Sequence, residues 1–220
     1  MLFTIITVCF NSEMTIERTI QSVLNQTCQD YEYIIIDGAS TDGTMDIVRK
    51  YEPLFQGRMR WISEKDQGIY DAMNQAVEEA KGHFVFFLNC GDWFMDEQVL
   101  ADMHDRIAGH EQTGTEHSAI YYGNVYERVT GQLVSSNPKL NAFGCYRNVP
   151  CHQACFYERE LLLRHPFQLE YRVRADYEQF LWCFFVPDEK NLCSLWHRKF
   201  LPQGSVSVPL CRWTLQMTNR

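Results

Sequence analysis

The stretch His83–Asp92, HFVFFLNCGD, decides how the rest of the chain is interpreted. It is an apolar run that stops in a short polar tip, which contains a glycine and ends on a carboxylate, Asp92. A continuous apolar run of this kind is typical of a strand buried on both faces, as in a parallel sheet flanked by helices. In such sheets, ligands bind just beyond the carboxyl ends of the strands. The sequence therefore predicts a ligand site at Asp92.

Three further predicted strands precede this stretch, at residues 2–10, 31–36 and 59–63. Between them, apolar residues recur at helical spacing, which indicates a helix after each strand. Gly82 stands where the cap of the last of these helices is expected. The alternation of strand and helix predicts an α/β fold with a mainly parallel sheet and right-handed crossovers.

Beyond Asp92 the pattern changes to a mixture of helical and strand-like segments. Residues 119–125 and 129–135 are strand-like and flank a short polar segment, which predicts a hairpin. An apolar run at 151–157 and a helix around 177–184 follow. We therefore expect an α+β second half joined to a Rossmann-like first half.

Composition limits the possible classes of function. The chain has 220 residues, 45% of them hydrophobic and 22% charged, which is ordinary for a globular protein. The net charge of -8 argues against a nucleic-acid partner. No apolar run reaches the length of a membrane span and no leader precedes the first strand, so we expect a cytoplasmic protein. Its nine cysteines include no C-x-x-C pair, which favours reduced thiols.

Polar clusters follow three of the predicted strands, at residues 11–12, 37–40 and 89–92. Acidic strand ends suit the ribose and base of a nucleotide, but they suit its phosphates only when a divalent cation lies between. The glycine-rich G-x-G-x-x-G and Walker-type phosphate loops are both missing. The sequence therefore predicts a nucleotide site whose phosphates are neutralised by a metal ion.

Several ordered blocks resemble one family. Residues 7–44, TVCFNSEMTIERTIQSVLNQTCQDYEYIIIDGASTDGT, resemble the opening of family 2 glycosyltransferases, which have the GT-A fold. Residues 63–93, SEKDQGIYDAMNQAVEEAKGHFVFFLNCGDW, resemble their next signature, including the position of the Asp-x-Asp metal motif. PCHQACFYERELL, RVRADYEQFLW and FLPQGSVS resemble weaker blocks of the bacterial polysaccharide-type members.

The resemblance implies a single GT-A domain over residues 1–220, with a nucleotide-binding half at 1–95, an acceptor and catalytic half at 96–207 and a tail at 208–220. It also implies transfer of a sugar, with inversion, from a nucleotide diphosphate sugar to a hydroxyl of a glycan or lipid-linked glycan in surface polysaccharide synthesis. A lipid-linked acceptor would bring the protein to the inner face of the membrane as a peripheral partner.

The resemblance also assigns the donor site. Asp37 matches the acid that holds the nucleotide base, and the rest of the nucleotide set is Asn11, Ser40, Asp66 and Asp71. Asp92 matches the last carboxylate of the metal motif and would bind Mn²⁺ or Mg²⁺. The chain departs from the motif here, because Asn89 and Gly91 stand at its other two positions. A single anionic ligand weakens metal binding, since hard cations prefer carboxylate oxygens.

On the acceptor side, Asp176 matches the catalytic base, which takes the proton of the acceptor hydroxyl as the new bond forms. His152 and Gln153 match a His-Gln pair that lines the donor or acceptor side. His197 matches a late metal-binding histidine of some members. The remaining residues expected in the donor and acceptor pocket are Asn89, Gly91 and Trp93.

Each of these residues also has a purely structural interpretation. Loop carboxylates such as Asp37 and Asp92 commonly cap turns, and Asp176 is suited to a helix N-cap. Acids at the start of a helix, such as Asp66, are favoured by its dipole. Two rival functions remain open at this point. A nucleotidyltransferase would need a basic glycine-rich loop after the first strand, and a non-catalytic nucleotide-sugar-binding relative would explain the altered metal motif.

Overall fold

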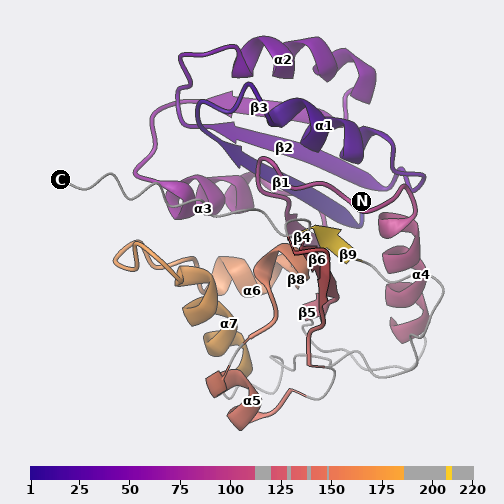
Figure 1. The fold of residues 1–220 in the computed structure, drawn as a ribbon, viewed down its shortest axis with the longest axis vertical. Helices are drawn as coiled ribbons and strands as arrows, with labels where there is room; N and C mark the ends of the chain where they lie inside the picture. Colours follow the sequence, from indigo (N-terminus) through magenta and orange to yellow (C-terminus); the bar gives the residue numbers. More distant parts are fainter. Residues whose placement is uncertain (112–119, 128–129, 138–139, 148, 186–206, 210–220) are drawn as a thin grey trace.

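The computed structural model describes residues 1–111, 120–127, 130–137, 140–147, 149–185 and 207–209 (Figure 1). Its centre is a six-stranded sheet with the order β3-β2-β1-β4-β8-β5. The bounds of these strands are β1 Phe3–Cys9, β2 Tyr31–Asp37, β3 Met59–Ser63, β4 Phe84–Phe87, β5 Ile120–Tyr122 and β8 Cys155–Glu158. This arrangement confirms the predicted α/β fold with a mainly parallel sheet.

The strands β1 to β4 are parallel, and their carboxyl ends lie along one edge of the sheet. All seven residues of both β1 and β2 are buried, which is why their sequences are mostly apolar and do not alternate between apolar and polar residues. The register pairs Cys9 with Asp37 and Asp37 with Ser63. The polar residues that follow neighbouring strands are therefore brought together.

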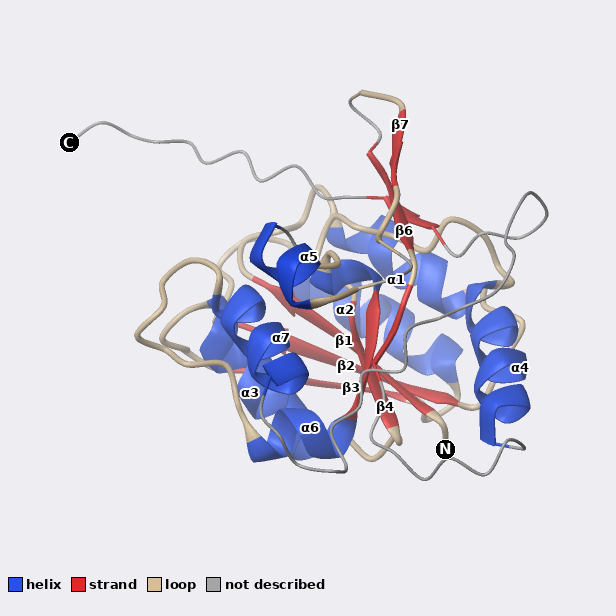
Figure 2. Cartoon of the chain, turned by 90° about the horizontal axis from the view of Figure 1, so that it is seen from below, coloured by secondary structure: helices blue, strands red, loops and turns tan. Residues whose placement is uncertain are grey.

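Helices cover both faces of the sheet, and each face has its own hydrophobic cluster. On one face, α1, α2 and α4 contribute buried side chains, and on the other face α3, α6 and α7 do so. Figure 2 shows α3, α6 and α7 on one side of the strands and α4 on the other. The helix bounds are α1 Ile16–Leu24, α2 Thr44–Tyr51, α3 Ile69–Glu79, α4 Val99–Glu111, α5 Ala142–Arg147, α6 Arg159–Arg164 and α7 Ala175–Phe185, with short 3-10 helices η1 Glu52–Phe55 and η2 His152–Ala154.

The second half of the chain enters the sheet through β8, which pairs antiparallel with both β4 and β5. Aromatic rings hold this insertion in place. The ring centroids of Phe86 and Phe156 are 4.4 Å apart, and those of Phe3 and Phe156 are 5.4 Å apart. Such pairs contribute about 0.5–1.5 kcal/mol each beyond the apolar area they bury. The core is therefore continuous between the two halves.

The predicted hairpin exists, but its position was wrong. Residues 119–125 do not form one strand, because β5 ends at Tyr122 and β6 (Asn124–Glu127) belongs to a second sheet. Gly123 lies between them and donates its N–H to the carbonyl of Ala154 (2.9 Å). The second sheet has the order β7-β6-β9, with β7 at Gln132–Val134 and β9 at Ser207–Pro209.

Gly82 is needed for a reason other than the one predicted. The helix α3 ends at Glu79 with an extended C-cap at Ala80, so the expected glycine cap is wrong. A Cβ on Gly82 would lie 2.5 Å from the carbonyl carbon of Phe3 and from the nitrogen of Thr4. The Gly82 N–H donates to the hydroxyl of Thr4 (2.8 Å). Glycine is therefore required at position 82, because the backbone of this residue packs directly against the backbone of Phe3 and Thr4.

None of the helices in the described ranges has the length and apolar content that crossing a bilayer requires.

We predict that Gly82→Ala lowers the free energy of unfolding by about 1–3 kcal/mol, because the added methyl overlaps backbone that cannot move aside cheaply. The matched control is Gly109→Ala within α4, where a Cβ would meet nothing within 4 Å. That change should be neutral or stabilising by about 0.4–1 kcal/mol. Urea denaturation of the two variants measures the difference, and equal midpoints would contradict the prediction.

Candidate functional site

Asp37 lies at the carboxyl end of β2 and is fully buried. One carboxylate oxygen accepts hydrogen bonds from the Ser40 backbone N–H (3.0 Å) and the Ser63 hydroxyl (2.6 Å). The other accepts from the Ser40 hydroxyl and from the thiol of Cys9 (3.7 Å). Asp37 therefore organises the loop that follows β2 and joins it to the ends of β1 and β3.

Two further residues of the expected nucleotide set lie in the same corner. Asn11 follows β1 with a φ of 46°, in the left-handed region that asparagine tolerates better than most residues. Its backbone N–H donates to the Ser40 hydroxyl (2.7 Å), and its side-chain oxygen accepts from the Thr41 N–H (2.9 Å). The structure thus brings together Asn11, Asp37 and Ser40.

Asp66 approaches this corner from the loop before α3. A Cβ on Gly38 would lie 2.8 Å from Asp66 Oδ2, so the absence of a side chain at Gly38 makes room for the carboxylate. Asp66 Oδ1 accepts from the Gly68 N–H (2.9 Å), and Asp71 Oδ2 accepts from the Gln67 N–H (2.9 Å). These two acids fix the start of α3, as their structural interpretation predicts, and Asp66 also borders the nucleotide corner.

The turn after β4 is anchored by Thr19 of α1. Its hydroxyl accepts from the Gly91 N–H (3.0 Å) and donates to the carbonyl of Asp92 (2.7 Å). Gly91 has a φ of 97°, a conformation that favours glycine. Asp92 is only 1% exposed. Next to it, the guanidinium carbon of Arg18 lies 3.4 Å from the ring centroid of Trp93, so one face of this indole is occupied by a cation.

His152 and Gln153 lie against the same turn. They begin η2, directly before β8, and both are buried. His152 Nε2 is 3.5 Å from the side-chain nitrogen of Asn89. The antiparallel pairing of β4 with β8 explains this contact, because it places the residues just before β8 beside those just after β4. The structure therefore brings Asn89, His152 and Gln153 together, although they are distant in sequence.

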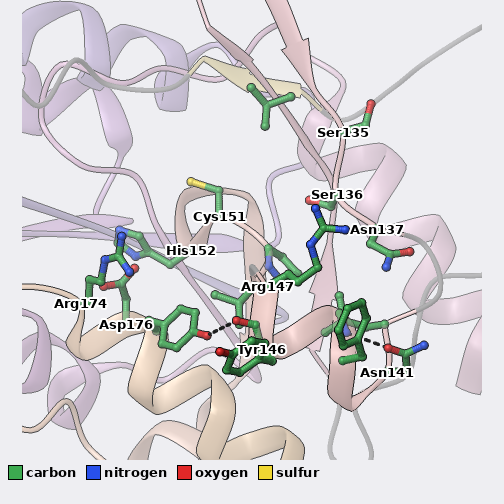
Figure 3. Close-up of a pocket in the computed structure, with 17 residues that line it drawn as sticks. Ser135, Ser136, Asn137, Asn141, Tyr146, Arg147, Cys151, His152, Arg174 and Asp176 are labelled. Atoms are coloured by element: carbon green, nitrogen blue, oxygen red, sulfur yellow. Dashed lines mark hydrogen bonds between the residues drawn. The ribbon is translucent and has the colours of Figure 1, made fainter.

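Asp176 lines a cavity of about 790 Å³ in the second half of the chain (Figure 3). Cys151, His152 and Arg174 also line this cavity. Asp176 lies in the first turn of α7, and its Oδ1 accepts a hydrogen bond from the hydroxyl of Tyr70 (2.8 Å) on α3. Burial, with Asp176 adding to it, raises the pKa of Tyr70 to about 12, so this phenol remains a donor.

Arg174 enters α7 in a strained conformation. Its φ of 67° is left-handed, which costs a non-glycine residue about 1–3 kcal/mol. Its carbonyl accepts from the N–H groups of Tyr177 (3.1 Å) and Glu178 (3.2 Å), so the bend also starts the helix. The strain is thus located beside Asp176.

Three cysteine thiols, of Cys9, Cys90 and Cys151, lie near the three expected carboxylates. Burial raises the pKa of Cys9, and Cys90 and Asp37 add to the rise. Burial also raises the pKa of Cys151 to about 12, and both Asp92 and Asp176 add to it. Asp92 and Asp176 thus both act on the thiol of Cys151.

The oxygens around Asp92 form a candidate site for a divalent cation. Within the described ranges, no three histidine, cysteine, aspartate or glutamate side chains are grouped closely enough to bind a metal ion. The chain offers the Asp92 carboxylate and the Asn89 Oδ1, which is buried and has no hydrogen-bond partner among the described residues. Both are oxygen ligands suited to Mg²⁺ or Mn²⁺. They fit a cation whose other positions are filled by substrate phosphates. His197, the other expected ligand, lies outside the described residues.

Sequence reasoning missed two residues of this site. Tyr70 is at helical spacing from Met73 and Val77, which predicts a core aromatic, but its hydroxyl contacts Asp176. Ser63 was interpreted only as the end of a strand, but it bonds Asp37. A hydroxyl at the first turn of a helix or at a strand end is the signal that could have identified them.

We predict a pH-dependent loss of stability caused by His152. Burial lowers the pKa of this ring below its usual value, although Asp176 acts in the opposite direction. Above about pH 6.5 the ring is neutral in both states, and below it the unfolded chain gains the proton first. The free energy of unfolding then falls by up to about 1.4 kcal/mol per pH unit.

Urea denaturation at about pH 7.5 and about pH 5.5 measures this effect. The fall should be smaller in His152→Gln, whereas His104→Gln, at an exposed histidine, should behave as the wild type. An identical fall in all three proteins would contradict the assignment.

Known proteins resemble this chain in sequence and in fold. The sequence profile of glycosyl transferase family 2 matches residues 4–164. The PGL/p-HBAD biosynthesis glycosyltransferase of Mycobacterium bovis (strain BCG / Pasteur 1173P2) is 35% identical over 187 residues, which cover 84% of this chain and 71% of that protein. The putative teichuronic acid biosynthesis glycosyltransferase TuaG of Bacillus subtilis (strain 168) is 38% identical over 116 residues, 51% of this chain and 46% of that protein.

Solved structures have the same fold. S. aureus TarS 1-349 in complex with UDP-GlcNAc superposes with a TM-score of 0.64 at 24% identity, over 76% of this chain and 49% of that one. The mannosyltransferase PcManGT from Pyrobaculum calidifontis, in complex with GDP-Man and Mn²⁺, gives a TM-score of 0.58 at 20% identity, over 80% and 50%. The chain thus spans about half the length of these solved structures. By its sequence profile and its sheet, the chain belongs to glycosyl transferase family 2 and has the GT-A fold.

Proposed function

We propose that this protein is a metal-dependent, inverting glycosyltransferase that moves a sugar from a nucleotide diphosphate sugar to a hydroxyl of a glycan or lipid-linked glycan in surface polysaccharide synthesis. The observation that carries the proposal is Asp176, which lines a 790 Å³ cavity and accepts a hydrogen bond from Tyr70. Its field reaches Cys151 together with that of Asp92, which ends the turn after β4. This shared influence on Cys151 supports a site in which Asp176 is the base and Asp92 binds the donor.

The relatives support the substrate class. Their printed names place them in PGL/p-HBAD and teichuronic acid biosynthesis, and the structural neighbours bind UDP-GlcNAc or GDP-Man. We propose that residues 1–95 bind the donor and that residues 96–207 bind the acceptor, with 208–220 as a tail. The proposal extends to a cytoplasmic protein that meets a lipid-linked acceptor peripherally at the inner membrane face.

For the donor, the corner formed by Asn11, Asp37, Ser40 and Asp66 would hold the nucleoside. Both oxygens of Asp37 accept hydrogen bonds from serine hydroxyls, and a hydroxyl rotates freely. A base or ribose donor that reaches Asp37 therefore replaces one of these hydroxyls without breaking the loop. Asp71, in the first turn of α3, accepts a hydrogen bond from the Gln67 N–H and so fixes the backbone of the loop that carries Asp66.

Asp92 and Asn89 would hold a Mn²⁺ or Mg²⁺ ion against the donor diphosphate. When bound, such a cation neutralises the charge that gathers on the leaving diphosphate. His152 contacts Asn89 and is uncharged near neutral pH, since burial lowers its pKa. A neutral imidazole at this position adds no repulsion toward the cation.

On the acceptor side, the chemistry falls to Asp176. Its carboxylate takes the proton of the acceptor hydroxyl as the hydroxyl oxygen bonds to the anomeric carbon, and the diphosphate leaves from the opposite face. One base and one leaving group on opposite faces invert the anomeric centre in a single displacement. Tyr70 keeps one oxygen of Asp176 occupied, which directs the other toward the acceptor.

Two variants test this function. With UDP- and GDP-sugars and Mn²⁺, Asp176→Asn should lower turnover by about 10²–10⁴-fold and leave binding of the nucleotide diphosphate unchanged. Asp92→Asn should instead remove the effect of Mn²⁺ on nucleotide binding. Release of the nucleotide diphosphate reports turnover, and thermal shift with and without Mn²⁺ reports binding. Nucleotide binding without turnover for every donor and acceptor would favour a non-catalytic relative. Release of pyrophosphate from a nucleoside triphosphate and a sugar 1-phosphate, supplied in a separate assay, would favour a nucleotidyltransferase.

We also predict that Tyr70→Phe lowers kcat by about tenfold, the loss expected for one hydrogen bond to a charged group. The ring keeps its contact with Phe167, whose centroid lies 5.5 Å away, so the fold is retained. The loss should appear in kcat and not in the KM for the donor, because Tyr70 contacts Asp176.

The matched control is Tyr177→Phe, because the Tyr177 hydroxyl also lies in the cavity wall but donates to the carbonyl of Cys145 (2.9 Å). Its kcat should stay close to that of the wild type. If both variants lowered kcat equally, the Tyr70–Asp176 contact would have no special role.

A further inference from the structure

The end of the cavity away from Asp176 is built from hydrogen-bond donors. Ser136, Asn137, Asn141 and Arg147 line it, and they come from the segment between β7 and α5 and from α5 itself. In Figure 3, Arg174 lies on the same side as Asp176, whereas Arg147 extends toward Ser136 and Asn137. The cavity therefore has Asp176 and Arg174 at one end and Arg147 at the other.

The charges in this wall differ from those of the chain as a whole. The chain has 28 acidic and 20 basic residues, but the wall contains two arginines, Arg147 and Arg174, and one acid, Asp176. Both arginines are exposed, and neither takes part in an ion pair within the described residues. A guanidinium binds phosphate and carboxylate groups in a bidentate way. The wall is therefore selective for an anionic ligand.

Two asparagine side chains of the cavity wall lie close to Gly144 of α5. A Cβ on Gly144 would lie 3.3 Å from Asn137 Nδ2 and 3.4 Å from Asn141 Oδ1, so this glycine lets the two amides approach the helix. Asn141 Oδ1 accepts from the Gly144 N–H (2.8 Å), so the amide nitrogen is the group through which Asn141 can donate to a ligand. Asn141 thus adds a neutral donor to the wall that contains Arg147.

Apolar side chains border the same cavity. Phe143 is 69% exposed, Tyr146 is 81% exposed and Val134 is 43% exposed, and all three are in its wall. An apolar segment attached to the ligand would cover them. A lipid phosphate and a sugar carboxylate are both anions that a guanidinium binds. They differ in that only the lipid would also cover the three apolar side chains.

We propose that the acceptor carries an anionic group, a phosphate or a carboxylate, which Arg147 binds at the far end of the cavity while the acceptor hydroxyl lies at Asp176. This proposal rests on the proposed glycosyl transfer. It adds that Arg147 determines acceptor specificity, because an acceptor with both groups at the right separation is positioned at both ends. A neutral acceptor is held only at the base.

The test uses two pairs of probes that differ by one anionic group: farnesyl phosphate with farnesol, and methyl glucuronide with methyl glucoside. Calorimetry on the full chain should give at least about tenfold tighter binding for the anionic member of one pair, as expected for one charge-assisted contact. Arg147→Ala should abolish this preference, and Arg147→Lys should restore part of it. Arg172→Ala is the matched control, because Arg172 is an exposed arginine of the loop before α7 that does not line the cavity.

The pair that shows the preference identifies the source of the anion. Preference for farnesyl phosphate indicates a lipid phosphate, and preference for the glucuronide indicates an acidic sugar. Equal binding within both pairs, or a preference that survives Arg147→Ala, would overturn the proposal. An Arg147-dependent preference without sugar transfer would overturn the proposed function instead and leave an anion site.

Discussion

The structure depends on the two pairings of β4, which is parallel to β1 on one side and antiparallel to β8 on the other. Parallel pairing with β1 aligns the turn after β4 with the loops after β1 and β2, where Asp37 is buried. Antiparallel pairing with β8 brings the chain back, so that His152 arrives next to Asn89. If β8 were parallel to β4, the carboxyl end of β8 and not its start would lie beside Asn89. The orientation of one strand therefore decides which segments of the second half meet the donor corner.

The helix α3 is the second link between the halves. Its start is fixed by Asp66 and Asp71, which belong to the donor side. One turn later, Asn74 exchanges two hydrogen bonds with the backbone of Phe167, of 2.8 Å and 2.9 Å. Tyr70 lies between these anchors and reaches Asp176. Asp176 is thus hydrogen-bonded by a helix that contacts both the loop beside Asp37 and the second half of the chain, so a shift of either half would move the other.

The first half of the fold could be predicted from the sequence because strands buried on both faces are continuously apolar and end in polar tips. The second half could not be placed as well. Gly123 transfers the chain from one sheet to another within an apolar run, and periodicity does not reveal which sheet a strand joins. Gly82 was predicted as a cap because its contact with Phe3 and Thr4 joins residues 78 positions apart, which local periodicity does not reveal. Tyr70 was interpreted as core, since nothing local indicates a partner 106 positions away.

The three thiols near the carboxylates have a consequence for the reactivity of the protein. Burial and the neighbouring carboxylates raise the pKa of Cys9, Cys90 and Cys151, so each remains a protonated thiol. A thiol is a poor nucleophile, and alkylating reagents act on the thiolate. These cysteines are therefore expected to react slowly with alkylating reagents in the folded chain. The rate at which they are alkylated would report how often this part of the molecule opens to solvent, without any added label.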